Sequence, residues 1–275
     1  MQGSITQLKL LQPKSVADAL HMLRDEGPLT PLAGCTDLYV SLNFGTLTET
    51  RFLNIWGLAP LRTIATRGDV LTVGALVTYT DVMRSALVRK RLPMLAAAAS
   101  EIGGVQIQNR GTIGGNVANA SPAGDTLPVL AAVDALVVLA RANETRRVPF
   151  TQFFTGYRQT VRRPDELILG FEVPAVRGRQ WFRKVGTRAA QAISKVVFAA
   201  VDDRRSPPRL AFGSVAPTVM RARRTEAALG NGCSLAEAQA ELMAELSPID
   251  DMRSTAEYRR RVAANLLAQF ARTLG

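Results

Sequence analysis

The sequence predicts an α+β protein of two units, and three observations support this. Strand-like and helix-like stretches are mixed over residues 1–173. A short stretch of Pro, Gly and Arg, residues 174–179, then interrupts the pattern, as linkers between domains do. Three apolar strand-like runs and two helices with capping signals follow it. We therefore expect units at residues 1–176 and 177–275, with the ligand-binding segments in the first.

In the first unit, capping residues and helix breakers mark most elements. Ser15, with Asp18 three residues later, caps the first helix. Pro93 stands in the first turn of an alanine-rich helix that ends at Gly103. The elements expected here are helix 15–24, a strand ending at residue 32, a short helix from residue 37, strand 51–55, paired strands within 61–76 around a Gly68–Asp69 turn, a helix capped by Thr80 and Asp81, helix 92–102, a helical or extended segment 125–132, and strands 135–140 and 166–173.

The second unit is expected to hold a three-stranded antiparallel sheet packed against helices. Its apolar runs, at residues 181–185, 193–201 and 210–215, predict the strands. Ser234 and Ser254 each precede a glutamate by three residues, which is the spacing of a capping box, so each begins a helix. An apolar stripe at residues 258, 262, 266 and 270 lets the last helix pack onto the strands.

Composition limits the classes of protein. With 275 residues, 47% of them hydrophobic and 21% charged, the chain is typical of a soluble globular protein. No apolar run approaches the roughly 20 residues of a membrane span, and the N-terminus lacks a secretory pattern. We therefore expect no integral membrane segment. Cys35 and Cys233, the only cysteines, form no CxxC pair, which indicates a cytoplasmic location and excludes an iron–sulfur cluster held by this chain.

Charge and histidine content narrow the chemistry further. The net charge of +11 comes mainly from arginine, but aromatic residues are 6% of the chain and no nucleic-acid-reading motif is present. Docking onto acidic partner subunits is therefore favoured over nucleic acid as the use of this charge. His21, on the first helix, is the only histidine in the sequence. A zinc site with two histidines is therefore excluded.

Two segments rich in small residues, both expected to be loops, predict the binding of a dinucleotide. Glycine allows the backbone to approach a ligand closely, and open N–H groups among small residues suit phosphate. The first segment is Leu32, Ala33, Gly34, Cys35, Thr36 and Asp37; the second is Thr112, Ile113, Gly114, Gly115 and Asn116, followed by Asn119 and Ser121. The chain offers little acid–base machinery of its own, so a redox cofactor that brings its own chemistry is favoured.

These motifs resemble the FAD-binding (medium) subunit of molybdenum hydroxylases, the xanthine dehydrogenase / carbon monoxide dehydrogenase family. The resembling segments, in chain order, are residues 32–38, 106–116, 119–125, 153–157, 165–167, 184–188, 248–251 and 256–259. They span nearly the whole chain. The resemblance implies a two-lobed FAD-binding domain of the vanillyl-alcohol-oxidase (PCMH) type, with lobes at about residues 1–56 and 57–176. A C-terminal domain like that of the CO dehydrogenase flavoprotein would follow over residues 177–275.

The resemblance also implies roles for single residues. Thr30, Pro31 and the first segment, together with residues 112–116, would hold FAD through its pyrophosphate, and Ser121 would also bind the cofactor. Asp125 would accept a hydrogen bond from a ribose hydroxyl, and Ile102 and Ile168 would line the flavin or adenine pocket. Lys184 would lie near the isoalloxazine ring, as would the segment 186–194 that governs access of the electron acceptor.

One position departs from the resembling family. Most relatives have two glycines in the first segment, whereas this chain has Gly34 and Cys35. A side chain is tolerated at little cost only where φ is negative, so we expect a negative φ at Cys35. Whether its thiol has a role beside the pyrophosphate is left open.

The implied function is that of an electron-transfer subunit with FAD as its cofactor. A large subunit would carry the molybdopterin cofactor and hydroxylate the substrate, and a small subunit would carry [2Fe-2S] clusters, in a dimer of heterotrimers. Two alternatives remain: a stand-alone FAD-dependent oxidase of the same fold, and a non-catalytic module that binds nucleotide or nucleic acid.

Overall fold

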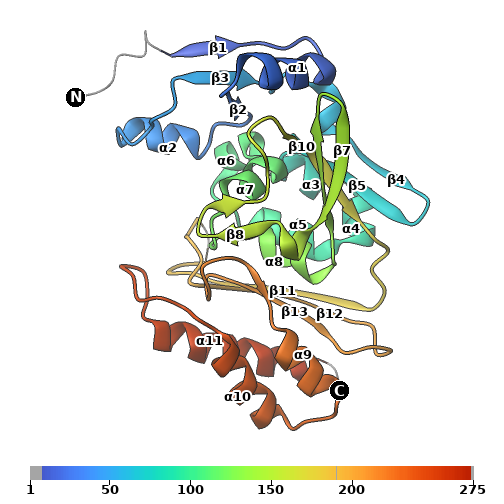
Figure 1. Ribbon diagram of the computed structural model, residues 1–275. Helices are drawn as coiled ribbons and strands as arrows, with labels where there is room; N and C mark the ends of the chain where they lie inside the picture. The colour runs from blue at the N-terminus through green and yellow to red at the C-terminus, as the bar shows by residue number, and fades with distance from the viewer. Residues whose placement is uncertain (1–7, 190, 274–275) are drawn as a thin grey trace.

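The computed structural model describes residues 8–189 and 191–273 and consists of three successive parts, each built on its own sheet (Figure 1). A small parallel sheet with two helices lies at one end, and a five-stranded sheet with most of the helices lies in the middle. The C-terminal sheet lies at the other end, with helices α9 Arg223–Gly230, α10 Leu235–Glu245 and α11 Ala256–Ala271 on its outer face. The predicted mixture of helices and strands is confirmed. Within the described residues, no helix has both the length and the apolar character needed to cross a membrane.

The first lobe is built on a parallel sheet in the order β1–β3–β2. Its elements are β1 Lys9–Leu11, α1 Val16–Glu26, β2 Thr30–Leu32, α2 Leu38–Asn43 and β3 Arg51–Asn54. The predicted cap of α1 is confirmed, since Ser15 Oγ accepts the N–H of Asp18 at 3.0 Å. The first small-residue segment therefore joins the end of β2, an edge strand of this sheet, to the start of the short helix α2.

The second lobe is an antiparallel sheet in the order β4–β5–β10–β6–β7, packed against short helices. Its elements are η2 Ala59–Arg62, β4 Ile64–Arg67, β5 Val70–Gly74, α3 Tyr79–Arg84, α4 Ala86–Arg91, α5 Pro93–Ser100, α6 Val105–Arg110, α7 Ile113–Asn119, α8 Leu127–Ala132, β6 Leu136–Arg141, β7 Glu144–Pro149, η3 Phe150–Gln152, β8 Phe154–Gly156, β9 Gln159–Thr160 and β10 Leu167–Val173. The turn predicted at Gly68 is confirmed, with φ +59°. The cap of α3 is Thr78 with Asp81, not Thr80.

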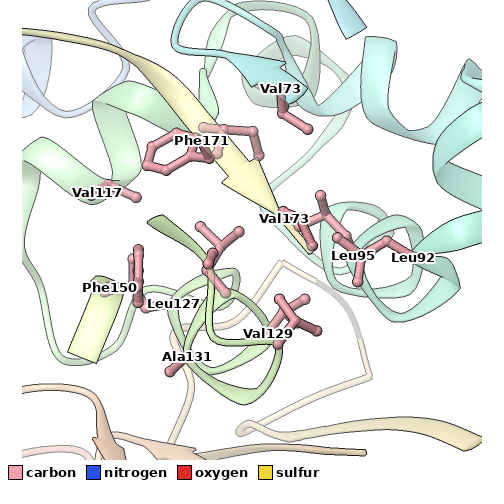
Figure 2. Close-up of a cluster of buried hydrophobic side chains, with 14 of the residues drawn as sticks. Val73, Leu92, Leu95, Val117, Leu127, Val129, Ala131, Phe150, Phe171 and Val173 are labelled. Atoms are coloured by element: carbon pink, nitrogen blue, oxygen red, sulfur yellow. The ribbon is translucent and has the colours of Figure 1, made fainter. Parts of the chain in front are cut away.

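Helix α8 forms the centre of the core. All six of its residues are buried, and it contacts β12 Val196–Asp202 and β13 Arg209–Gly213 of the C-terminal sheet. A helix that is apolar on every side must be enclosed by protein. Figure 2 shows side chains of α8 packed beside Phe150, Phe171 and Leu95 of the second lobe. This shared core ties the second lobe to the C-terminal domain.

The C-terminal domain has one strand more than predicted. Besides β11 Arg179–Val185, β12 and β13, the two-residue strand β14 Met220–Arg221 pairs with β13, and helices α9 Arg223–Gly230, α10 Leu235–Glu245 and α11 Ala256–Ala271 follow. The capping box of α10, Ser234 with Glu237, is confirmed. The cap of α11 was predicted one residue too early, because Ser254 lies in a turn with Asp251 while Thr255 Oγ1 accepts the N–H of Tyr258.

Candidate functional site

The two small-residue segments meet in space. Gly34 lies so close to the backbone of Arg110, just before the second segment, that a Cβ at Gly34 would overlap the carbonyl oxygen of Arg110. Only glycine permits this approach. Both segments line one cleft of about 1200 Å³, which also reaches the C-terminal domain. One extended ligand can therefore contact both segments at once.

The first segment supplies open backbone donors. Within the described chain, no backbone N–H of residues 34–37 donates to a protein acceptor. The expected negative φ at Cys35 is wrong: its φ is +64°, in the left-handed region. Its Sγ lies 3.4 Å from the carbonyl oxygen of Ala33, and burial raises the pKa of the thiol, partly offset by the nearby charge of Arg110. The left-handed backbone at this position explains why glycine suits it.

The second segment is the helix α7, so the expectation of a second open loop is wrong. Thr112 caps the helix, its Oγ1 accepting the N–H of Gly115 at 3.0 Å. The N–H groups of Ile113 and Gly114 donate to backbone carbonyls after strand β5, and a Cβ at Gly114 would lie 2.6 Å from that of Ala75. This segment therefore contributes close packing and polar side chains more than open amides.

Asp125 and Lys184 form a buried ion pair at the cleft. Lys184 Nζ lies 2.6 Å from Asp125 Oδ2 and donates to the carbonyl oxygen of Glu101 at 2.9 Å. The side chain of Lys184 is 5% exposed and that of Asp125 is 9% exposed. Burial raises the pKa of Asp125 to about 6, against the lowering effect of Lys184. Asp125 Oδ1 is buried without a hydrogen-bond partner, so it is an acceptor available to a ligand hydroxyl.

The structure brings most of the sequence-predicted site residues to this cleft. Those lining it are Thr30, Pro31, Leu32, Ala33, Gly34, Cys35, Thr36, Asp37, Ile102, Thr112, Gly114, Gly115, Asn116, Ser121, Asp125 and Ile168. Ile113 instead belongs to the hydrophobic core. Lys184 does not line the cleft and reaches the site only through Asp125.

The cleft wall also includes residues of the C-terminal domain: Ser194, which ends the segment 186–194 expected near the flavin ring, and Ser214, which the sequence did not single out. Ser194 and Ser214 of the C-terminal domain face each other with 3.0 Å between their Oγ atoms, and Ser194 Oγ donates to the carbonyl oxygen of Ala123. Arg259 of α11 donates to the carbonyl oxygen of Ser214 and to Asp251. The cleft wall is therefore not confined to the first unit. An isolated serine such as Ser214 carries no local signal that could have predicted this.

Comparisons with known proteins agree along nearly the whole chain. Residues 6–176 match the model of the FAD binding domain in molybdopterin dehydrogenase, and residues 181–274 match that of the CO dehydrogenase flavoprotein C-terminal domain. The carbon monoxide dehydrogenase medium chain of Hydrogenophaga pseudoflava is 32% identical, covering 93% of this chain and 92% of that protein. The xanthine dehydrogenase FAD-binding subunit of Escherichia coli O157:H7 is 31% identical, over 89% and 88%.

Solved structures give the same result. The structure of carbon monoxide dehydrogenase from Hydrogenophaga pseudoflava, in a form that lacks the Mo-pyranopterin moiety of the molybdenum cofactor, matches with a TM-score of 0.91. That match has 30% sequence identity and covers 96% of this chain and 95% of the other.

Proposed function

Because this chain belongs to the family of FAD-binding medium subunits of xanthine and carbon monoxide dehydrogenases, we propose that it relays electrons from partner iron–sulfur centres to an external acceptor. The partners are a large subunit, which hydroxylates the substrate at its molybdopterin cofactor, and a small subunit with [2Fe-2S] clusters. One copy of each chain forms a heterotrimer, and two heterotrimers form a dimer, in the cytoplasm. The chain divides into residues 1–176, which bind FAD, and residues 177–275.

One observation carries the FAD assignment: a buried acceptor and a run of open donors face the same cleft. Asp125 Oδ1 has no protein partner, and neither have the amides of residues 34–37 within the described chain. A dinucleotide offers the complementary groups, sugar hydroxyls that donate and phosphate oxygens that accept. The residues present therefore fit FAD.

Different residues of the cleft bind different parts of FAD. The amides of residues 34–37 hold the diphosphate, Asp125 accepts from a sugar hydroxyl, and Lys184 orients the Asp125 carboxylate. Ile102 and Ile168 give apolar surface to the ring systems. FAD, when bound, supplies the redox chemistry by taking up an electron pair and releasing it to an acceptor.

Purification with flavin analysis tests FAD binding. The chain is expected to copurify with non-covalent FAD. Asp125→Asn is expected to lower its FAD affinity by roughly tenfold, since a neutral amide oxygen replaces a charged, stronger acceptor. Asp69→Asn, on the exposed turn between β4 and β5, is the matched control. A wild-type chain that purifies without flavin and does not bind added FAD would refute the assignment.

Rapid mixing tests the relay itself. Reduced small subunit added to the FAD-loaded chain is expected to bleach the flavin absorption band, and the deflavo complex is expected to lose reduction of the external acceptor. Oxidation of an alcohol by the isolated chain, without molybdenum, would favour the stand-alone oxidase instead.

A further inference from the structure

The tip of the β8–β9 hairpin places an arginine between the two small-residue segments. Arg158 Nη1 donates to Asn119 Oδ1, at the end of α7, at 3.1 Å. The same nitrogen lies 3.9 Å from Asp37 Oδ2, at the end of the first segment. Arg158 lines the cleft, and its side chain is 48% exposed. A third part of the chain therefore brings a positive charge to the end of the first segment and the end of α7.

The conformation of this tip is itself unusual. Arg158 has φ +54°, in the left-handed region that residues other than glycine rarely adopt. Such conformations are retained where the surrounding structure holds them, often at functional sites. Within the described chain, the Nε and Nη2 groups of Arg158 donate to no protein acceptor. The guanidinium is thus anchored at one nitrogen and has further donors available.

The other arginines of the cleft are engaged elsewhere. Arg162 donates to backbone carbonyls of its own loop. Arg253 pairs with Asp251, and Arg259 bonds the same carboxylate. Arg110, whose charge reaches Cys35, has its guanidinium stacked over a tryptophan ring at 3.9 Å and does not line the cleft. Among the described cleft residues, Arg158 is therefore the cation in contact with the first segment.

We propose, resting on the FAD-binding function above, that Arg158 is a cofactor-binding residue whose guanidinium pairs with the diphosphate held by the amides of residues 34–37. Those amides are neutral donors, and Asp37 adds a negative charge beside them. A diphosphate there needs a counter-charge, and a guanidinium supplies it with two parallel N–H donors. Asp37 and Asn119 hold that guanidinium in place.

Ligand pairs that differ only in phosphate separate this role from a structural one. FAD is compared with riboflavin, and ADP with adenosine, by flavin fluorescence and by displacement of FAD from the full chain. Arg158→Gln is expected to weaken FAD and ADP by roughly 10- to 100-fold and to leave riboflavin and adenosine unchanged. Arg158→Lys keeps the charge and is expected to retain part of the affinity. Arg141→Gln removes an equally charged arginine of similar exposure, 42%, outside the cleft and is expected to match wild type.

The other outcomes overturn the proposal in distinguishable ways. Equal loss of FAD and riboflavin would assign Arg158 a role in hairpin structure only. Unchanged FAD affinity in Arg158→Gln, with wild-type binding intact, would remove Arg158 from the site but leave the FAD assignment standing. A wild-type chain that binds neither FAD nor ADP would overturn the proposed function and this inference with it.

Discussion

Replacement of Lys184 by methionine tests the buried ion pair at the cleft. The ordinary pKa of Asp125 is 3.8 and its pKa in the folded chain is about 6. This shift of roughly two units corresponds to about 3 kcal/mol that favours folding only while the carboxyl is protonated. The contribution is complete below the ordinary pKa and is lost as the pH rises through about 6. Lys184 lowers the pKa of Asp125, so Lys184→Met raises it further and extends the loss to higher pH.

The free energy of unfolding of Lys184→Met is therefore expected to fall further below that of wild type as the pH rises. The difference approaches the roughly 3–5 kcal/mol of a broken buried pair at about pH 8 and is smaller at about pH 5. Urea denaturation at both pH values measures it. Adding Asp125→Asn to the variant removes the uncompensated charge and is expected to restore part of the loss at high pH. Lys90→Met, at an exposed position, is the control. A difference that stays constant with pH, and no recovery in the double variant, would refute the reasoning.

Three further predictions concern backbone and caps. Gly34→Ala is expected to abolish FAD binding and to lower the midpoint of urea unfolding, because the added Cβ would overlap the backbone carbonyl of Arg110. Gly57 has open space around it, so Gly57→Ala is expected to change neither property. Cys35→Gly removes the strain of a left-handed residue with a side chain, roughly 1–2 kcal/mol, but raises the conformational entropy lost on folding by roughly 0.5–1 kcal/mol. The variant is therefore expected to be as stable in urea as wild type, or slightly more stable. Thr255→Ala removes the N-cap of α11 and is expected to lower the free energy of unfolding by about 1 kcal/mol, whereas Ser254→Ala is expected to lower it by less. A larger loss of thermal stability in Ser254→Ala than in Thr255→Ala would contradict the observed cap.

Local signals predicted the elements whose cause is local. The Ser15 and Ser234 caps, the Gly68 turn and the paired strands around it depend on residues a few positions apart, and all were confirmed. The two-residue strand β14 has too few residues for a pattern of its own, and pairing with β13 alone defines it. Thr255 caps α11 instead of its neighbour Ser254 because a turn with Asp251 already engages that serine.

The second segment shows tertiary packing overriding local preference. Two adjacent glycines disfavour a helix by roughly 1 kcal/mol each, so the sequence suggested an open loop. In the structure, carbonyls at Ala75 and Val77 accept its first N–H groups, and Gly114 packs where a Cβ would not fit. Cys35 likewise adopts a left-handed φ that its own side chain disfavours.

By itself, the sequence determined the class of the fold, the family and the two segments that line the cleft, since these are written in short stretches of neighbouring residues. Only the tertiary structure decided which donors stay open, that Lys184 reaches Asp125 across 59 positions, and that Arg158 meets both segments. Such pairings depend on how separate lobes dock around a shared core, and no local spacing of residues encodes that geometry.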